Sequence, residues 1–330
     1  MLRETCSTKR IEYIDIARGL VIVLVVLGHS YSTTNGLTLW LGTFHMPFFF
    51  IISGVVYGIR VDSGRDLSLN VIAKTKSLLL PYLIWGTLYQ LFVSVLSIIG
   101  GSPAEDTLKM RLRLVVTLQS GVMWFLPAMY IATILFHLNW KHKALATAMG
   151  IAALAAAVFI PHSSDIAEAL LRSFTGLFFI GVGFWGHAIL TKPVHPCLTI
   201  AICICNILLM PYGGSIGMSE RTFGTFPLLV IIKAVMGSYA AIQLAMIIEK
   251  QLVYRRPLLI WGERSIVILC LHPFIIQVFR LTDHFLFNDV VSTWGLTEGI
   301  ILTTITMILI TIFMPINLEL LGWTWGWTRK

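Results

Sequence analysis

The sequence predicts an all-α polytopic membrane protein of about ten transmembrane helices. Two observations carry this prediction. Hydrophobic residues make up 57% of the 330 residues and charged residues only 12%, whereas soluble domains carry about a quarter charged residues. Apolar stretches also recur along the whole chain, each of about 20 residues, which is long enough to cross a hydrocarbon core of roughly 30 Å as a helix. Helices are favoured there because they satisfy every backbone group without water.

Hydropathy predicts ten spans, near 11–31, 38–60, 76–99, 122–139, 143–160, 169–190, 195–212, 223–249, 258–280 and 297–320. An even number puts both termini on one side, and most of the 24 Lys and Arg residues fall in the loops on that side. Because cytoplasmic loops are enriched in these residues, both termini are predicted to be cytoplasmic. No loop is long enough for a soluble domain, so residues 1–330 are expected to form one domain within the lipid bilayer. The external loop 100–121 carries the amphipathic piece LKMRLRLVV, which is expected at the membrane surface.

The net charge of +8 does not indicate a nucleic-acid partner. The basic residues are spread over short loops and form no run or aromatic-interleaved basic face. The five cysteines have neither metal-ligand nor disulfide-framework spacing, so no metal site is predicted; they are Cys6, Cys197, Cys203, Cys205 and Cys270.

The stretch DIARGLVIVLVVLGHS, residues 15–30, is the first candidate functional segment. Arg18 and His29 bracket its apolar core, and a segment that only crosses a membrane would contain neither. They are 11 residues apart, which returns to nearly the same helix face about 16 Å further along the axis. Asp15 stands three residues before Arg18 and can pair with it. Arg18 is expected near the inner interface and His29 in the outer third, and charged groups inside a membrane mark substrate or ion pathways.

The second span, with the sequence LGTFHMPFFFIISG, carries a further candidate residue. His45 is expected at the depth of His29, and only a short loop joins the two spans, so the two imidazoles are expected to converge. Pro47 frees a backbone carbonyl within this span. Ser53 and the glycine after it permit close helix approach.

Spans nine and four add weaker candidates. In ERSIVILCLHPFII, Arg264 is expected to pair with Glu263 at the cytoplasmic lip, and His272 is expected near mid-membrane. In WFLPAMY, Trp124 is expected at the outer interface, where aromatic belts lie. The run from Gly213 to Gly217 matches G-x-S-x-G, but no strand precedes it, so a nucleophilic serine is not predicted.

These segments together resemble the integral-membrane acyltransferase-3 family. The likeness rests on RIEYIDIARGLVIVLVVLGHS, FHMPFFFIISG, WFLPAMY and SIVILCLHPFII, which follow one another in the family's order along the whole chain. It is greatest to the branch of fucose 4-O-acetylase-like and O-antigen polysaccharide O-acetyltransferases. The spacing of Arg and His on the first span is its most specific part.

The resemblance implies transfer of an acyl group, acetyl by preference, from cytoplasmic acetyl-CoA to a hydroxyl of a cell-envelope glycan. The acceptor is a lipid-linked or polymeric glycan, such as an O-antigen or exopolysaccharide repeat. The location implied is the inner (cytoplasmic) membrane of a bacterium. By motif position the essential pair is Arg18 and His29.

Individual residues can be assigned to the parts of this reaction. Asp15, Arg18 and Arg264 are expected to hold the anionic donor, with His29 as general base on the acceptor hydroxyl. His45 is a further catalytic candidate, and Trp124, His272 and Ser53 are expected to orient substrate. Direct transfer and an acyl-histidine relay stay open, as does the oligomeric state.

Two other functions compete with acyl transfer. A proton-coupled transporter would use His29, His45 and Asp15 as a proton relay, and it would need no acyl-CoA. A non-catalytic scaffold would have no need for paired intramembrane polar groups.

Overall fold

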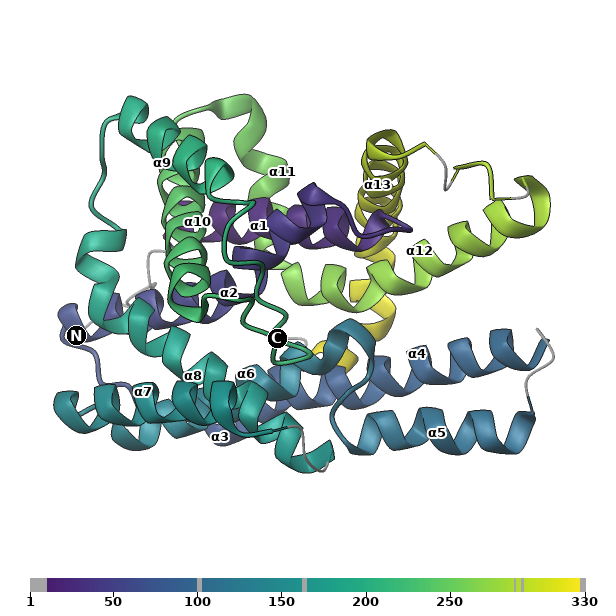
Figure 1. The fold of residues 1–330 in the computed structure, drawn as a ribbon, viewed down its shortest axis with the longest axis horizontal. Coiled ribbons are helices and arrows are strands. Elements are labelled where there is room, and N and C mark those ends of the chain that lie inside the picture. The colour runs from purple at the N-terminus through teal and green to yellow at the C-terminus, as the bar shows by residue number, and fades with distance from the viewer. Residues whose placement is uncertain (1–10, 100–102, 162–164, 288, 292–293, 327–330) are drawn as a thin grey trace, which may run out of the picture.

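The computed structural model describes residues 11–99, 103–161, 165–287, 289–291 and 294–326. Within these ranges the chain is a bundle of helices (Figure 1), and only an isolated bridge between Gly217 and Thr222 pairs extended backbone. The helices are α1 (Glu12–Ser30), α2 (Gly36–Asp62), α3 (Val71–Lys74), the π-helical turn η1 (Thr75–Leu79), α4 (Leu80–Ile99), α5 (Ala104–Val116), the 3-10 turn η2 (Gly121–Trp124), α6 (Phe125–Asn139), α7 (Lys143–Phe159), α8 (Asp165–Leu190), α9 (Pro196–Leu208), α10 (Pro227–Ile248), α11 (Leu252–Glu263), α12 (Ser265–Phe287), α13 (Leu296–Leu321) and the 3-10 turn η4 (Gly322–Trp325).

The lengths and composition of these helices confirm an all-α polytopic membrane protein. In the described part of the chain, eight helical segments are long and apolar enough to cross a membrane, and two shorter apolar helices lie at Leu145–Phe159 and Pro196–Leu208. These ten segments overlap the ten predicted spans. The 13 residues of α9 would cover about 20 Å of helix, which is shorter than a hydrocarbon core.

The predicted ninth span, 258–280, is wrong as a single helix. Arg264 leaves the helical conformation, with φ −111° and ψ 21°, and separates α11 from α12. The break follows the place where α11 packs closely on α1. A Cβ added to Gly262 would contact the Asp15 carbonyl, and one added to Gly19 would contact the Leu258 carbonyl.

The predicted external loop 100–121 contains a helix that packs on the bundle. This helix, α5, lies beside α4 (Figure 1). The Tyr82 hydroxyl on α4 donates a hydrogen bond of 2.8 Å to the Val115 carbonyl on α5. The amphipathic face of LKMRLRLVV therefore has a protein partner as well as an exposed side.

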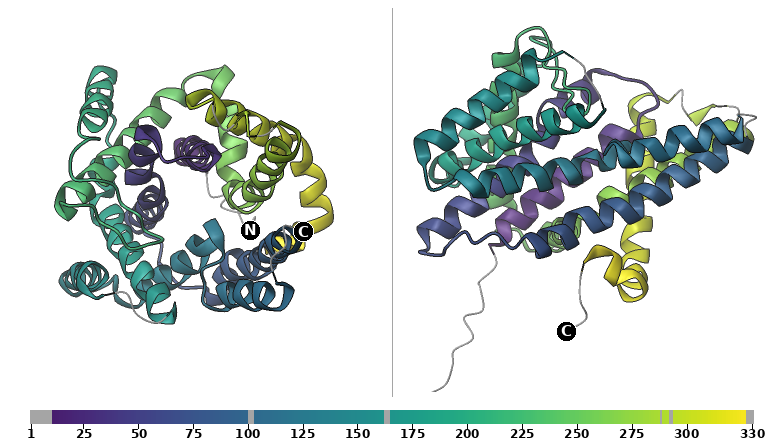
Figure 2. Two further views of the ribbon diagram at one scale, coloured as in Figure 1. Left: turned by 45° about the vertical axis from the view of Figure 1, so that its right-hand side comes forward. Right: turned by 90° about the horizontal axis from the view of Figure 1, so that it is seen from below.

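Helix α1 lies inside the bundle. It packs against α2, α10, α11, α12 and α13, and the left view of Figure 2 shows it surrounded by other helices. Two polar residues of α1, Arg18 and His29, therefore line cavities of the bundle.

Small residues set the distance between α2 and α8. A Cβ added to Gly54 would contact the Ile180 carbonyl, and one added to Gly183 would contact the Ile51 carbonyl. Close backbone approach through glycine is the usual way in which helices associate in a membrane. This contact holds α2, and with it His45, at a fixed distance from the rest of the bundle.

Candidate active site

One cavity of about 270 Å³ opens around Arg18, and we call it the Arg18 cavity. Its lining comes from α1, α2, α3, η1, α6, α11 and α12. The polar side chains in this lining are Arg18, Ser53, Tyr57, Lys74, Ser77, Thr133, Glu263 and Ser265.

Two cations give the Arg18 cavity its electrostatic character. The Arg18 guanidinium lies 3.2 Å from the Asp15 carboxylate, and its side chain is 29% exposed whereas that of Asp15 is 4% exposed. Lys74 Nζ donates a 3.2 Å hydrogen bond to the Tyr57 hydroxyl. The carboxylate thus fixes Arg18 from the buried side and leaves it open to the cavity, where a phosphate is a fitting ligand.

The π-helical turn η1 positions part of this wall. Single π turns are uncommon and occur often at functional sites. Here the turn follows Lys74 directly and contributes Ser77 and Leu78 to the lining. Thr75 in the same turn shares a 3.0 Å hydrogen bond with the Tyr130 hydroxyl on α6, which ties η1 to the bundle.

A second cavity, of about 350 Å³, opens around His29, and we call it the His29 cavity. The C-terminal end of α1, the N-terminal half of α2, η2 and the segment 215–220 form its walls. Its polar lining residues are His29, Thr34, Thr38, His45, Trp124, Ser215, Ser219 and Glu220. The structure therefore brings His29 and His45 to one cavity.

Three imidazoles gather at this level. The rings of His29 and His272 are tilted by 31° with their centroids 5.5 Å apart. His45, on α2, lines the same cavity as His29. His45 Nδ1 contacts the Leu41 carbonyl, and His272 Nδ1 contacts the Ile268 carbonyl at 2.9 Å. A carbonyl accepts but does not donate, so both rings carry their proton on Nδ1 and a lone pair on Nε2.

The buried nitrogen of His272 is unusual. His272 is fully buried, and its Nε2 has no hydrogen-bond partner among the described residues. Buried polar atoms without a partner are rare, and each asks for a structural or chemical reason. The ring beside it is that of His29, so the two imidazoles are considered together.

Arg280 fixes the end of α1 that carries His29. Its guanidinium donates hydrogen bonds to the carbonyls of His29 and Tyr31, at 3.0 and 2.7 Å. The last carbonyls of a helix have no partner within the helix. A cation from α12 takes that role here and holds α1 against α12.

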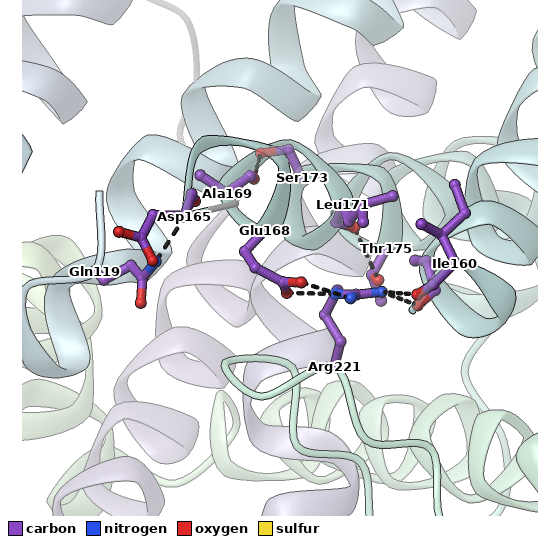
Figure 3. A network of polar contacts seen from close by, with 10 residues as sticks. Gln119, Ile160, Asp165, Glu168, Ala169, Leu171, Ser173, Thr175 and Arg221 are labelled. Carbon is purple, nitrogen blue, oxygen red and sulfur yellow. Dashed lines mark hydrogen bonds and ion pairs between the residues drawn. The ribbon is translucent and has the colours of Figure 1, made fainter. Parts of the chain in front are cut away.

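The loop that bears Glu220 is anchored by a buried ion pair (Figure 3). Arg221 points away from the loop into the bundle, where Nε and Nη2 donate to the Glu168 carboxylate at 2.6 and 2.7 Å. Nη1 donates to the carbonyls of Ala157 and Ile160 at 2.7 and 3.0 Å. This fourfold anchorage from α7 and α8 fixes the wall of the His29 cavity.

The remaining candidate residues fall in different places. Trp124 is only 8% exposed and lines the His29 cavity, so it is not a lipid-facing anchor. Ser53 lies in the Arg18 cavity, apart from the histidines, and donates to the Phe49 carbonyl at 2.8 Å.

At the α11–α12 junction the lining of the Arg18 cavity includes Glu263 but not Arg264. Ser215, from the G-x-S-x-G match, lines the His29 cavity on an irregular loop instead of a strand-to-helix turn.

Three residues of the site were missed by sequence reasoning. These are Lys74, Arg280 and Glu220, none of which lies in a segment that the sequence singled out. A signal for Lys74 exists, since it directly precedes an apolar span. Arg280 and Glu220 reach the site through tertiary contacts that have no local pattern. Among the described residues, no three potential metal ligands come together.

Comparison with known proteins identifies the family of this chain. The acyltransferase 3 family, described as an acyltransferase domain, matches residues 11–315. A similar protein is the nodulation protein NolL of Mesorhizobium japonicum, at 28% identity over 166 residues, which are 47% of this chain and 43% of NolL. The chain thus matches less than half of that relative's length, and no solved structure matches it. Because the family match covers nearly the whole chain, this protein belongs to the acyltransferase 3 family.

Proposed function

We propose that the protein transfers an acyl group, acetyl in the first instance, from acyl-CoA to a hydroxyl of a cell-envelope glycan. The observation that carries this proposal is the division of polar groups along one face of α1. Arg18 opens to one cavity and His29 to the other, about 16 Å apart along the helix axis. Such a division suits a donor with an anionic head and a reactive end at a distance from it.

The Arg18 cavity suits the anionic part of acyl-CoA. Arg18 and Lys74 offer two cations, and hydroxyls from Ser53, Ser77 and Tyr57 surround them. Phosphate oxygens accept strong charge-assisted hydrogen bonds from such groups. The pantetheine arm is extended and uncharged with a reach on the order of 15–20 Å, which matches the Arg18-to-His29 separation.

His29 acts as the general base in this proposal. Its imidazole accepts the proton of the acceptor hydroxyl while the hydroxyl oxygen bonds to the carbonyl carbon of the thioester. The carbon–sulfur bond breaks, the sulfur leaves as thiolate, and the imidazolium returns its proton to that sulfur. The products are an O-acyl ester and free CoA thiol, and His29 ends as it began.

The neighbours of His29 support this role. The His272 lone pair stabilises the transient imidazolium, and His45 Nε2 is available to orient the acceptor hydroxyl. Trp124 and Glu220 suit a sugar, because an indole packs on a sugar's C–H face and a carboxylate accepts hydrogen bonds from its hydroxyls. The rest of the assignment is a bacterial inner membrane with both termini in the cytoplasm. The membrane follows from the family resemblance, and the placement of the termini rests on the distribution of basic residues.

The test is release of free CoA thiol from acetyl-CoA by purified protein in nanodiscs. Wild type is compared with His29→Ala and Arg18→Ala, with and without a lipid-linked glycan. We expect acceptor-dependent release that His29→Ala lowers by at least about 100-fold. Arg18→Ala is expected to raise the KM for acetyl-CoA, because it removes a contact to the donor.

Other outcomes separate the alternatives. Acceptor-independent release that is lost in His29→Ala would favour an acyl-histidine relay open to water. No release with any acceptor, together with pH-gradient-driven solute flux in vesicles, would overturn the proposal in favour of a transporter.

A further inference from the structure

The two cavities meet at a small apolar partition. Two residues, Met46 on α2 and Leu269 on α12, line both the Arg18 cavity and the His29 cavity. On α1, Ile22 belongs to the first cavity and Val25, three residues further, to the second. The boundary therefore lies between these two turns of α1.

The side chains of the partition are buried. The exposed fractions are 8% for Met46, 4% for Leu269, 1% for Ile22 and 0% for Val25. All four side chains are apolar, so the partition disfavours water between the two cavities.

The partition stands directly beside the candidate catalytic group. Met46 follows His45 in α2, and Leu269 precedes His272 by three residues on α12, which is about one helical turn. His272 is the residue whose ring lies 5.5 Å from that of His29. Met46 and Leu269 therefore stand where the Arg18 cavity and the His29 cavity adjoin.

We propose that Met46 and Leu269 form the passage for the acyl end of the donor and set the length of acyl chain that is transferred. This inference rests on the proposed function, since it assumes that the donor head is held at Arg18. Met46 is unbranched and changes rotamer easily, so it can move aside for a small group. A long acyl chain would have to displace both side chains from a packed position, which close-packed interiors oppose.

The experiment compares thiol release from acetyl-CoA and octanoyl-CoA with a fixed glycan acceptor. The variants Met46→Ala and Leu269→Ala remove one side of the passage each. We expect the ratio of kcat/KM for octanoyl-CoA to that for acetyl-CoA to rise by about tenfold or more, since single methylenes in apolar pockets change discrimination by that order.

Matched controls separate the passage from general loosening. Met246 on α10 and Leu177 on α8 are also buried, at 9% and 6% exposed, and neither lines the two cavities. Met246→Ala and Leu177→Ala lose similar packing, so we expect their chain-length ratio to stay at the wild-type value. A ratio that rises equally in the controls would overturn the inference.

A closing variant supplies the opposite test. Leu269→Trp is expected to lower acetyl transfer by about 100-fold, because it fills the passage. Binding of free CoA is expected to fall much less, since Arg18 and Lys74, the two cations of the donor cavity, are unchanged. Met46→Phe is a milder version should the tryptophan prevent folding. Wild-type transfer in both closing variants, with unchanged ratios in the alanine variants, would overturn the inference and leave the proposed function standing. Absence of thiol release by the wild type with every acyl-CoA would overturn both.

Discussion

His272 is the residue whose surroundings are least explained by packing. Its ring is fully buried, one nitrogen is bonded to its own helix, and the other faces no hydrogen-bond partner in the described ranges. A leucine or phenylalanine would fill that volume without an unpaired polar atom. The imidazole is therefore better explained by its neighbour His29 than by the stability of the helix bundle.

We predict that His272→Phe lowers kcat by about 10- to 100-fold, the usual range for loss of a group that assists proton transfer. The KM for acyl-CoA should change little, because His272 does not line the Arg18 cavity. Steady-state thiol release measures both constants. His284→Phe on the same helix is the control, since His284 is exposed and pairs with Asp289 at 3.0 Å. Unchanged kcat in His272→Phe would show that the orphaned nitrogen has no part in the reaction.

Lys74 gives a second prediction about a single residue. Lys74→Met should raise the KM for acyl-CoA by about tenfold, since a charge-assisted contact contributes about 1.5–3 kcal/mol. The kcat should change little, because Lys74 lines the cavity opposite to the one that holds His29. Lys76→Met is the matched control: Lys76 is exposed, only two residues further along, and does not line the Arg18 cavity. Equal KM values in the two variants would place the phosphates elsewhere.

Among the helices, the contact between α2 and α8 is one that glycine makes possible. Gly183→Ala should lower the thermal midpoint of unfolding in detergent, because its Cβ would meet the Ile51 carbonyl and overpacking costs about 1–3 kcal/mol. Gly181→Ala should be neutral or raise the midpoint, since its Cβ would have no neighbour within 4 Å and alanine favours a helix. The same destabilisation in both variants would mean that the contact with the Ile51 carbonyl does not decide the result.

The loop anchor gives a prediction at the level of elements. Glu168→Gln should destabilise the protein by about 3–5 kcal/mol, because it leaves the buried Arg221 guanidinium without its counter-charge. Asp165→Asn on the same helix breaks the ion pair with Arg113, whose side chain is 72% exposed, and should cost less than about 1 kcal/mol. Thermal unfolding in detergent compares the two. Equal losses would contradict a structural role for the buried pair.

The elements that sequence predicted are those with a continuous apolar signal. The Arg18–His29 helix, the convergence of His29 with His45, and the pairing of Asp15 with Arg18 follow from helical spacing and short loops, and all three are present. The break at Arg264 and the packing of α5 on α4 come from tertiary contacts, which override local hydropathy. Glu220 could not be predicted as a lining residue because Arg221 fixes that loop through partners more than 50 residues away.

At the scale of the whole molecule, the two cavities are predicted to face opposite sides of the membrane. The distribution of basic residues predicts that the loops next to the Arg18 cavity lie in the cytoplasm, where acyl-CoA is made available. It predicts that the loop carrying Glu220 lies on the other side. In the proposed reaction the donor enters from one side and the acceptor from the other, and the buried apolar partition lies between them. The proposed reaction therefore depends on how the protein is oriented as much as on its histidines.

Site-directed labelling in a cysteine-free background tests this orientation. Ser219→Cys at the His29 cavity should react with a membrane-impermeant maleimide added outside the membrane, whereas Ser77→Cys at the Arg18 cavity should react only in inverted vesicles. Added CoA should protect Ser77→Cys, because the nucleotide would occupy the same cavity. Ser63→Cys, exposed at the end of α2, should react from the same side as Ser77→Cys but without protection. Labelling of Ser77→Cys from outside would reverse the orientation, and an acyl donor made in the cytoplasm would then have no direct route to Arg18.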